Sequence, residues 1–193
     1  MSKIFIINTG FTQYIDGKLP IADGSNLFYD NKNLTTFSSD LSSLTNGTSM
    51  FHYCSNLISF NGDLSSLTNG MNMFTSCKNL TSFNNDLSSL TNGINMFDSC
   101  SNLTSFNGDL SSLTNGLGMF GNTSYSSTAL DLSSVESLAK NINNLAAQGK
   151  TSTIHIGISK TLKSDDSSAP INVALAEIRA KGWTVNELYS AYL

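Results

Sequence analysis

Residues 79–101 read NLTSFNNDLSSLTNGINMFDSCS, and close variants of this 23-residue stretch begin at Asn33, Asn56 and Asn102. Self-similarity at a fixed period of about 20–50 residues is typical of repeat proteins, in which each repeat is one structural unit. A degenerate copy, around the sequence GSNLFYDNK, precedes the full ones. The full copies cover residues 33–55, 56–78, 79–101 and 102–124.

Large apolar residues occupy the same positions in every copy. One repeat alone cannot bury them, whereas stacked repeats bury each position against its own copies. The sequence therefore predicts a β-rich α/β protein whose residues 23–124 form a solenoid of 23-residue coils. The apolar columns are Leu34, Leu57, Leu80, Leu103; Phe37, Phe60, Phe83, Phe106; Leu41, Leu64, Leu87, Leu110; Leu44, Leu67, Leu90, Leu113; Met50, Met73, Met96, Met119; and Phe51, Phe74, Phe97, Phe120.

Small polar residues recur as faithfully, and each column has an expected role. An Asn-Gly pair occurs in each copy, first at Asn46-Gly47, and indicates a turn in which glycine takes positive φ. Amides stacked about 4.8 Å apart can hydrogen-bond along the stack, which predicts an amide ladder in the Asn33 column. Stacked carboxylates repel one another when buried, so the Asp40 column is expected to accept backbone N–H bonds at a solvated turn. The remaining members of these two columns are Asn56, Asn79, Asn102 and Asp63, Asp86, Asp109.

The three cysteines, Cys54, Cys77 and Cys100, share one position of successive copies. The flanking copies carry Asn31 and Thr123 there, which are also small and able to hydrogen-bond the backbone. This pattern favours buried structural thiols. Three cysteines on successive coils cannot enclose a tetrahedral zinc ion. A disulfide is compatible with the distance between coils but would leave one thiol over.

The repeat resembles that of a known family. The spacing of its apolar, glycine and cysteine positions is similar to the BspA-like, Treponema-type leucine-rich repeat of 23 residues. The resemblance covers about residues 10–124, and its Met-Phe-x-x-Cys segment is its most specific part. It is carried in one copy by Leu80, Phe83, Gly93, Met96, Phe97 and Cys100.

The resemblance implies a leucine-rich-repeat solenoid and a binding protein of the bacterial surface or secretome. Ser- and Asn-rich versions with a KGWTV-like closing segment also resemble proteins of gut Bacteroidales and their phages. The chain departs from the family pattern at the sixth repeat position, where Gly62, Asn85 and Gly108 replace leucine. The strand of each repeat is therefore expected to be short or bulged.

Both ends of the repeat array are expected to carry caps, because terminal coils would otherwise expose core and unpaired strand edges. Residues 1–22 contain an apolar strand pattern, KIFIIN, and an Asp16-Gly17 turn, which predict a hairpin-like N-terminal cap. Residues 125–193 lack the repeat and predict a small α/β C-terminal cap.

Within the C-terminal cap, a capping-box pattern at Ser133–Glu136 predicts the start of a helix that stops at Gly149. Its apolar stripe is Val135, Leu138, Ile142 and Leu145. Residues 152–158 alternate isoleucines and predict a strand. Pro170 is expected to open a second helix that ends at Gly182, and Thr184–Glu187 to open a last short helix. The apolar face of the second helix is Ile171, Leu175 and Ile178.

Composition limits the partners that the surface can bind. The chain is 39% hydrophobic and 12% charged, with net charge -4 and pI near 4.9. The chain has too few Lys and Arg side chains to favour binding to nucleic acid or to an anionic membrane. The stretch MSKIFIINTG has only four consecutive apolar residues, whereas a signal peptide needs about 7–15. We therefore expect a chain made in the cytoplasm that is not exported by the usual route and does not insert into a membrane.

Motifs that suggest chemistry have simpler explanations in the repeat. The segment GLGMFG at 116–121 matches a dinucleotide-loop pattern, but its glycine and Met-Phe pair are repeat positions. A His52–Cys54 dyad would need a cysteine that points outward, against the expectation for its column. His155 is expected on the non-isoleucine face of the cap strand, as a surface or packing residue. We expect no catalytic, cofactor-binding or metal-binding residues, and no enzyme.

Positions that vary between copies are candidates for binding a partner. They flank the Met-Phe pair and follow the cysteine, whereas a hydroxyl-rich ribbon runs beside the predicted strands. A glycan or another protein could bind there, but drift on a neutral surface without a partner explains varying columns equally well. The candidate residues are His52, Tyr53, Thr75, Lys78, Asp98, Thr81 and Thr104.

Together these patterns predict a non-enzymatic module for adhesion or assembly. The leading context is a phage virion or tail-associated structural or receptor-binding protein, with the N-terminal strand as an attachment or oligomer contact. The alternative is a bacterial cell-surface adhesin of the BspA type that binds host protein or glycan.

Overall fold

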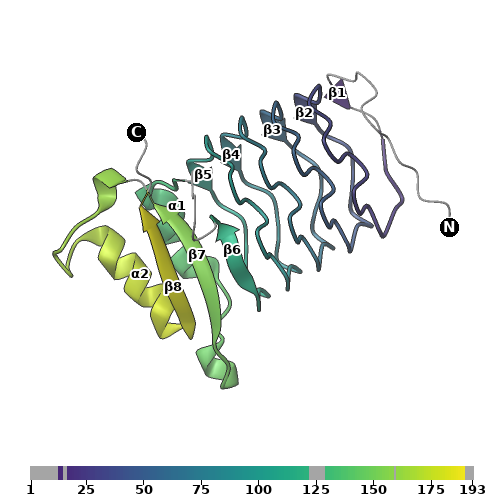
Figure 1. Ribbon diagram of the computed structural model, residues 1–193. Coiled ribbons are helices and arrows are strands. Elements are labelled where there is room, and N and C mark those ends of the chain that lie inside the picture. Colours follow the sequence, from purple (N-terminus) through teal and green to yellow (C-terminus); the bar gives the residue numbers. More distant parts are fainter. Residues whose placement is uncertain (1–12, 15–16, 122–128, 159, 190–193) are drawn as a thin grey trace.

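The computed structural model describes residues 13–14, 17–121, 129–158 and 160–189 (Figure 1). They form an α/β protein with few helices and short parallel strands in small sheets, and the described strands close no barrel. In chain order the elements are β1 (Gln13–Tyr14), β2 (Thr36–Phe37), β3 (Ser59–Phe60), β4 (Ser82–Phe83), β5 (Ser105–Phe106), β6 (Gly116–Phe120), α1 (Leu132–Asn141), the 3-10 turn η1 (Ala146–Gln148), β7 (Ser152–Ile158), the 3-10 turn η2 (Lys160–Leu162), α2 (Pro170–Ala180) and β8 (Trp183–Tyr189).

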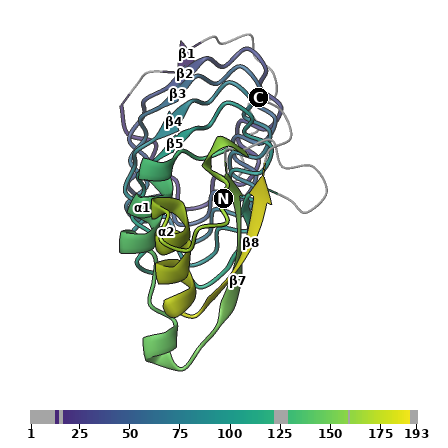
Figure 2. The same ribbon diagram turned by 90° about the vertical axis from the view of Figure 1, so that its left-hand side faces the viewer.

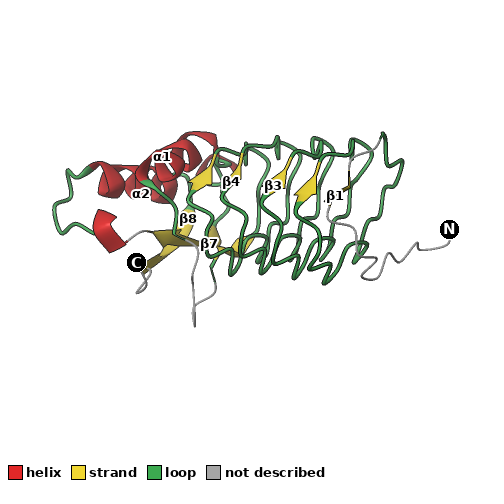
Figure 3. Ribbon diagram, turned by 90° about the horizontal axis from the view of Figure 1, so that it is seen from above, coloured by secondary structure: helices red, strands yellow, loops and turns green. Residues whose placement is uncertain are grey.

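Successive 23-residue copies lie side by side in parallel, and we call each copy a lap (Figures 1 and 3). Strand β2 pairs with β3 so that Phe37 lies opposite Phe60, and β4 pairs with β5 in the same register. A second line of parallel bridges joins Asn46 to Asn69, and continues through the same position of the next laps to Asn115. The predicted short strand is confirmed, because β2 to β5 are each two residues long.

Backbone hydrogen bonds between laps extend well beyond these short strands. Alternate amides of one lap donate to carbonyls of the next: Gly47 to Asn69 at 2.8 Å, and Ser49 to Met71 and Phe51 to Met73 at 2.9 Å. The same three bonds recur in the following lap, beginning with Gly70 to Asn92 at 2.9 Å. A loop can be buried against the core only when its backbone N–H and C=O groups form hydrogen bonds. Here the neighbouring lap provides the partners for these bonds.

All six predicted apolar columns are buried. Rings of one column stack nearly parallel along the array, with centroids of Phe51 and Phe74 5.4 Å apart and those of Phe74 and Phe97 5.5 Å apart. Rings of the other phenylalanine column meet them edge to face, as Phe60 does with Phe74 at 4.9 Å. Both arrangements are favourable for aromatic pairs, so the two phenylalanine columns form one continuous aromatic stack within the core.

The predicted glycine turn is wrong. None of Gly47, Gly70 and Gly93 is among the residues with positive φ. A Cβ on Gly47 would lie 2.8 Å from Sδ of Met73, and one on Gly70 would lie 3.0 Å from Sδ of Met96. Glycine suits this position because a side chain there would crowd the methionine of the next lap.

Two other positions make the left-handed turns instead, with non-glycine residues in the first four copies and Gly118 at the first position of the last lap. The first holds Asn26, Ser49, Asn72 and Asn95, and the second holds Asp30, Tyr53, Ser76 and Ser99. Asn, Asp and Ser are small and polar, and Asn and Asp tolerate left-handed backbone better than most residues. Tyr53 is the exception, with φ of 63°.

An amide ladder exists, but mainly in a different column from the predicted one. Nδ2 of Asn69 donates to Oδ1 of Asn46 at 3.1 Å, and Asn92 donates to Asn69 at 3.0 Å. In the predicted column, a side-chain bond joins Asn79 to Asn56 at 3.3 Å, whereas Asn56 donates to the Lys32 carbonyl. The ladder forms where the backbone bridges hold successive asparagines in register.

The predicted role of the aspartate column is confirmed. Oδ1 of Asp40 accepts the backbone N–H of Ser42 at 2.7 Å, and Asp63, Asp86 and Asp109 each accept from the residue two positions later. Hydrogen bonds from the side chain and backbone of Ser42 lower the pKa of Asp40. Each carboxylate thus closes a local turn.

The expected N-terminal hairpin falls largely on residues 1–12 and 15–16, which lie outside the described residues. The described part of residues 1–22 pairs in parallel, Gln13–Tyr14 with Thr36–Phe37 and Lys18 with Asp40. A hairpin would pair its strands antiparallel. Within the described residues, the parallel pairing of the laps therefore extends back to Gln13.

The C-terminal segment adds β7 and β8 to β6 of the last lap in a parallel sheet of order β6-β7-β8, with α1 and α2 packed together on one side (Figures 1 and 2). Strand β7 and helix α2, which Pro170 opens, are confirmed. The last short helix predicted at Thr184–Glu187 is wrong, because these residues lie in β8 and pair with β7. GLGMFG lies in β6 and the following residue.

The predicted capping box at Ser133 is also wrong. Helix α1 begins one residue after Asp131, whose Oδ1 accepts the backbone N–H of Ser134 at 2.8 Å. The helix ends at Asn141, because Ile142 is extended and bridges Leu110 of the last lap. All four residues of the predicted stripe are buried, and Gly149 takes φ of 67° after η1.

Phe83→Ala is expected to lower the free energy of unfolding by about 3–5 kcal/mol, because it removes a buried ring stacked between Phe60 and Phe106. Ser82→Ala is the matched control, since the exposed serine precedes Phe83 in β4. It should change stability by no more than about 0.5 kcal/mol. Urea unfolding measures both, and equal losses at the two positions would contradict the assigned facing of β4.

Candidate functional site

The predicted binding residues lie in two regions of the surface. His52, Thr75 and Asp98 occupy one position of successive laps, with Tyr53 beside His52. Thr81 and Thr104 lie beside β4 and β5, and both are exposed, as are Tyr53 and Lys78. Thr75 is a correction: it is buried, and its hydroxyl donates to the backbone oxygen of Asn95 at 2.6 Å. It fastens one lap to the next and is not available to a partner.

Three rings form a cluster at the first of these regions, which we call the aromatic cluster: Tyr29, His52 and Tyr53. Tyr29 is 41% and Tyr53 45% exposed, whereas His52 is half-buried. The rings of His52 and Tyr53 stack with centroids 4.2 Å apart, and Tyr29 meets His52 edge to face at 5.3 Å. Tyr29 was not among the predicted residues, although it holds the position of His52 in the degenerate copy.

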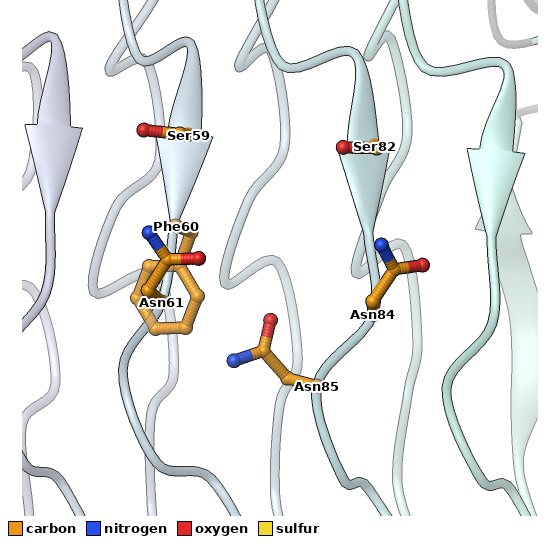
Figure 4. A pocket seen from close by; sticks show the side chains of 6 residues that line it. All are labelled: Ser59, Phe60, Asn61, Ser82, Asn84 and Asn85. Atoms are coloured by element: carbon orange, nitrogen blue, oxygen red, sulfur yellow. The ribbon is translucent and has the colours of Figure 1, made fainter.

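A small polar depression, the β3–β4 notch, lies in the second region (Figure 4). Its volume is about 120 Å³, and Ser59, Phe60, Asn61, Ser82, Asn84 and Asn85 line it. Strands β3 and β4 belong to different sheets. Asn61 donates to the Phe37 carbonyl at 2.8 Å and Asn107 to that of Phe83 at 2.9 Å, but the described residues show no corresponding bond from Asn84 to Phe60.

The side chain of Asn85 accounts for the notch. The equivalent position holds Gly62 in the preceding lap and Gly108 in the following lap. A Cβ added to Gly62 would lie 2.7 Å from the Phe60 ring, and a Cβ added to Gly108 would lie 2.7 Å from the Phe106 ring. Asn85 carries a whole amide there, and its Nδ2 donates to the Gly62 carbonyl at 2.7 Å. The Phe60–Phe83 centroid distance is 6.1 Å, against 5.4 Å for Phe37–Phe60 and 5.9 Å for Phe83–Phe106. Asn85 thus places a side-chain amide between the two laps where β3 and β4 do not pair.

The three cysteines are free, buried thiols. Sγ of Cys54 donates to the Phe28 carbonyl at 3.1 Å, and Cys77 and Cys100 make the same contact to Phe51 and Phe74. Burial raises the pKa of Cys54 to about 12 and also raises those of Cys77 and Cys100. A thiol held protonated is a poor nucleophile, so the His52–Cys54 pair does not form a dyad.

The two histidines have different surroundings. Burial lowers the pKa of His52, whose ring packs between the two tyrosines of the aromatic cluster. His155 is buried in β7, and its Nε2 lies 3.0 Å from Nδ2 of Asn186 in β8. The prediction of a packing role for His155 agrees with this placement. Among the described residues no group of three metal-ligating side chains converges.

The chain's stability should fall as pH rises above about 8.5, the ordinary thiol pKa. The unfolded chain ionises its cysteines there, whereas the folded chain keeps Cys54 protonated until pH about 12. The buried thiol therefore contributes its full stabilisation at a pH below the thiol pKa of the unfolded chain. This stabilisation is lost as the pH rises toward the thiol pKa of the folded chain. Urea unfolding across this pH range should give a shallower decline for Cys54→Ala than for the parent. Identical slopes would contradict the buried, protonated thiol.

Asn85→Gly is expected to close the β3–β4 notch, because Asn84 N–H can then reach the Phe60 carbonyl. Exchange of the Asn84 amide should slow by about 3- to 10-fold, the effect of one net hydrogen bond. Hydrogen exchange read by NMR measures it. The matched control is Gly108→Asn, which should open a second notch and speed exchange at Asn107. Unchanged exchange in both variants would rule out Asn85 as the cause.

Comparison with protein-family models, with characterised proteins and with solved structures finds no match to this chain. In the part of the chain that the structure describes, no helix is long and apolar enough to cross a membrane.

Proposed function

We propose that the protein is a leucine-rich-repeat solenoid of the BspA-like type that serves as a non-enzymatic module for adhesion or assembly. Parallel pairing at intervals of one 23-residue lap, from Asn46 to Asn115, supports the solenoid. The buried Met-Phe pairs and the buried cysteines, each bonded to a backbone carbonyl, support the family resemblance.

One observation supports a binding role over an enzymatic one. Neutral polar side chains recur on an exposed face once per lap, whereas the cysteine thiols are buried. Ser59, Ser82 and Ser105 succeed one another along β3, β4 and β5, and Thr81 and Thr104 flank them. Such a ribbon offers hydroxyl donors and acceptors to a protein or a glycan at regular intervals. We call these serines and threonines the hydroxyl ribbon.

The leading context is a phage virion or a tail-associated protein, because Ser- and Asn-rich repeats of this type resemble phage-borne versions. The alternative, a bacterial cell-surface adhesin, is favoured by the exposed rings of the aromatic cluster, since tyrosine is enriched where proteins bind partners. Both contexts make the same demand on the molecule, a partner that recognises the outer face of the laps.

Binding of fluorescently labelled protein to phage particles and to bacterial cells of gut Bacteroidales tests this function. We expect saturable binding, weakened about tenfold or more by Thr81→Asp combined with Thr104→Asp, because two carboxylates would crowd the hydroxyl ribbon. Thr91→Asp is the control, an exposed threonine of the bridge between laps that lies outside the ribbon.

The proposal fails if the protein binds neither particles nor cells. It also fails if a substrate screen finds turnover that His52→Ala abolishes, because that result would make the protein an enzyme. Equal loss of binding in the ribbon variant and in Thr91→Asp would remove the hydroxyl ribbon from the interaction.

A further inference from the structure

We propose that the aromatic cluster is a stacking site for one neutral sugar residue. This inference rests on the proposed function, because it names the ligand class of the same binding module. The site consists of Tyr29, His52 and Tyr53, with Tyr53 as the ring on which the sugar packs.

The backbone of Tyr53 gives the first argument. Its φ of 63° is left-handed, and a bulky side chain in this conformation is an outlier. The equivalent positions hold Asp30, Ser76 and Ser99, which are small and polar. Strained residues of this kind persist where the surroundings fix them, and they concentrate at functional sites. Here the Tyr53 amide donates to the Thr75 carbonyl at 2.9 Å, and its carbonyl accepts from Ser55 at 2.7 Å.

The arrangement of the rings gives the second argument. His52 stacks on Tyr53 at 4.2 Å with planes 30° apart, and Tyr29 stands at 89° to Tyr53 with centroids 5.8 Å apart. The ring of Tyr53 is therefore held from two sides but remains 45% exposed. An aromatic side chain fixed before binding loses little conformational entropy when a ligand covers it.

The charge around the cluster favours a neutral ligand. Asp30, next to Tyr29, is paired with Lys32, whose Nζ lies 3.2 Å from its carboxylate. Burial lowers the pKa of His52, which disfavours the charged imidazolium in the cluster. The Asp30–Lys32 pair has no net charge, so the surroundings of these rings favour neither a strongly acidic nor a strongly basic partner.

The extent of the cluster favours a sugar ring over a protein partner. In the next lap its positions hold Thr75 and Ser76, which are both buried, so the apolar surface stops after Tyr53 in that direction. Three rings are far smaller than the approximately 800 Å² that each partner contributes to a standard protein interface. They match one face of a pyranose ring.

The face of a tyrosine ring and the face of a pyranose ring are chemically complementary. The C–H bonds on one face of a pyranose carry partial positive charge, and the face of a tyrosine ring carries partial negative charge. Phenol hydroxyls of Tyr29 and Tyr53 and the imidazole of His52 can donate to or accept from the sugar hydroxyls at the rim.

Saturation-transfer NMR with four probes tests the site: methyl β-glucoside, methyl β-galactoside, methyl α-mannoside and N-acetylglucosamine. We expect at least one to bind with Kd on the order of 1–10 mM, a range usual for one weakly held ring. Tyr53→Ser should weaken that probe at least about tenfold, as loss of a stacking ring does. The variant should melt no lower than the parent, because serine occupies the same left-handed position at Ser76 and Ser99.

Ile58→Thr is the matched control. Ile58 is 51% exposed, and threonine holds its position in the other full laps, so the change also removes a large exposed side chain. It should leave probe affinity unchanged. Equal weakening by Ile58→Thr and Tyr53→Ser would overturn the assignment.

The remaining outcomes separate this inference from the proposed function. If no probe binds, or if Tyr53→Ser binds as tightly as the parent, the sugar site is wrong, whereas binding to cells or particles can still stand. If a probe binds through Tyr53 but the protein attaches to no cell or particle, the sugar site stands and the adhesion role fails. Loss of a protein partner in Tyr53→Ser, with no probe bound by the parent, would make the cluster a protein contact and overturn the sugar assignment.

Discussion

Hydrogen bonding between the backbones of adjacent laps is the constraint on which the rest of the structure depends. Gly47 donates to Asn69 and Gly70 donates to Asn92, so the same residue must return to the same place after every 23 residues. At this spacing phenylalanine rings stack, asparagine amides form a ladder, and a glycine must leave room for the methionine of the next lap. The faithful copying of small residues has the same cause as that of large ones.

The sequence predicts the structure correctly where a feature depends only on the repeat period and the residue type. The buried columns, the turn-closing aspartates, the inward cysteines and the short strands all follow from period and residue type. Contacts between distant segments were not predictable in this way. Thr184–Glu187 has local features of a helix start, but the free edge of β7 pairs with it as a strand. The glycine turn failed because Ser49, Asn72 and Asn95 take the left-handed conformation that was assigned to glycine.

The candidate site was predictable only in part. Variation between copies pointed to His52 and Tyr53, but it also selected Thr75, whose short side chain turns inward to a carbonyl of the next lap. Tyr29 lies in the degenerate copy, whose resemblance to the full copies rests on Gly24, Leu27 and Phe28. The β3–β4 notch had a visible signal, since Asn85 stands where two neighbouring laps have glycine, but its effect depends on contact with a ring that only the packing reveals.

The central claim, that residues one lap apart lie directly over each other, is tested most directly by disulfide formation between paired cysteines. Thr45 and Thr68 are exposed, and the Thr68 amide donates to the Thr45 carbonyl at 2.9 Å. Adjacent strands are about 4.8 Å apart, within disulfide range, whereas two laps span about 9.6 Å. The account predicts that Thr45→Cys with Thr68→Cys oxidises readily to an intramolecular disulfide and that Thr45→Cys with Thr91→Cys does not. Equal cross-linking of the two pairs, or preference for the second, would contradict it.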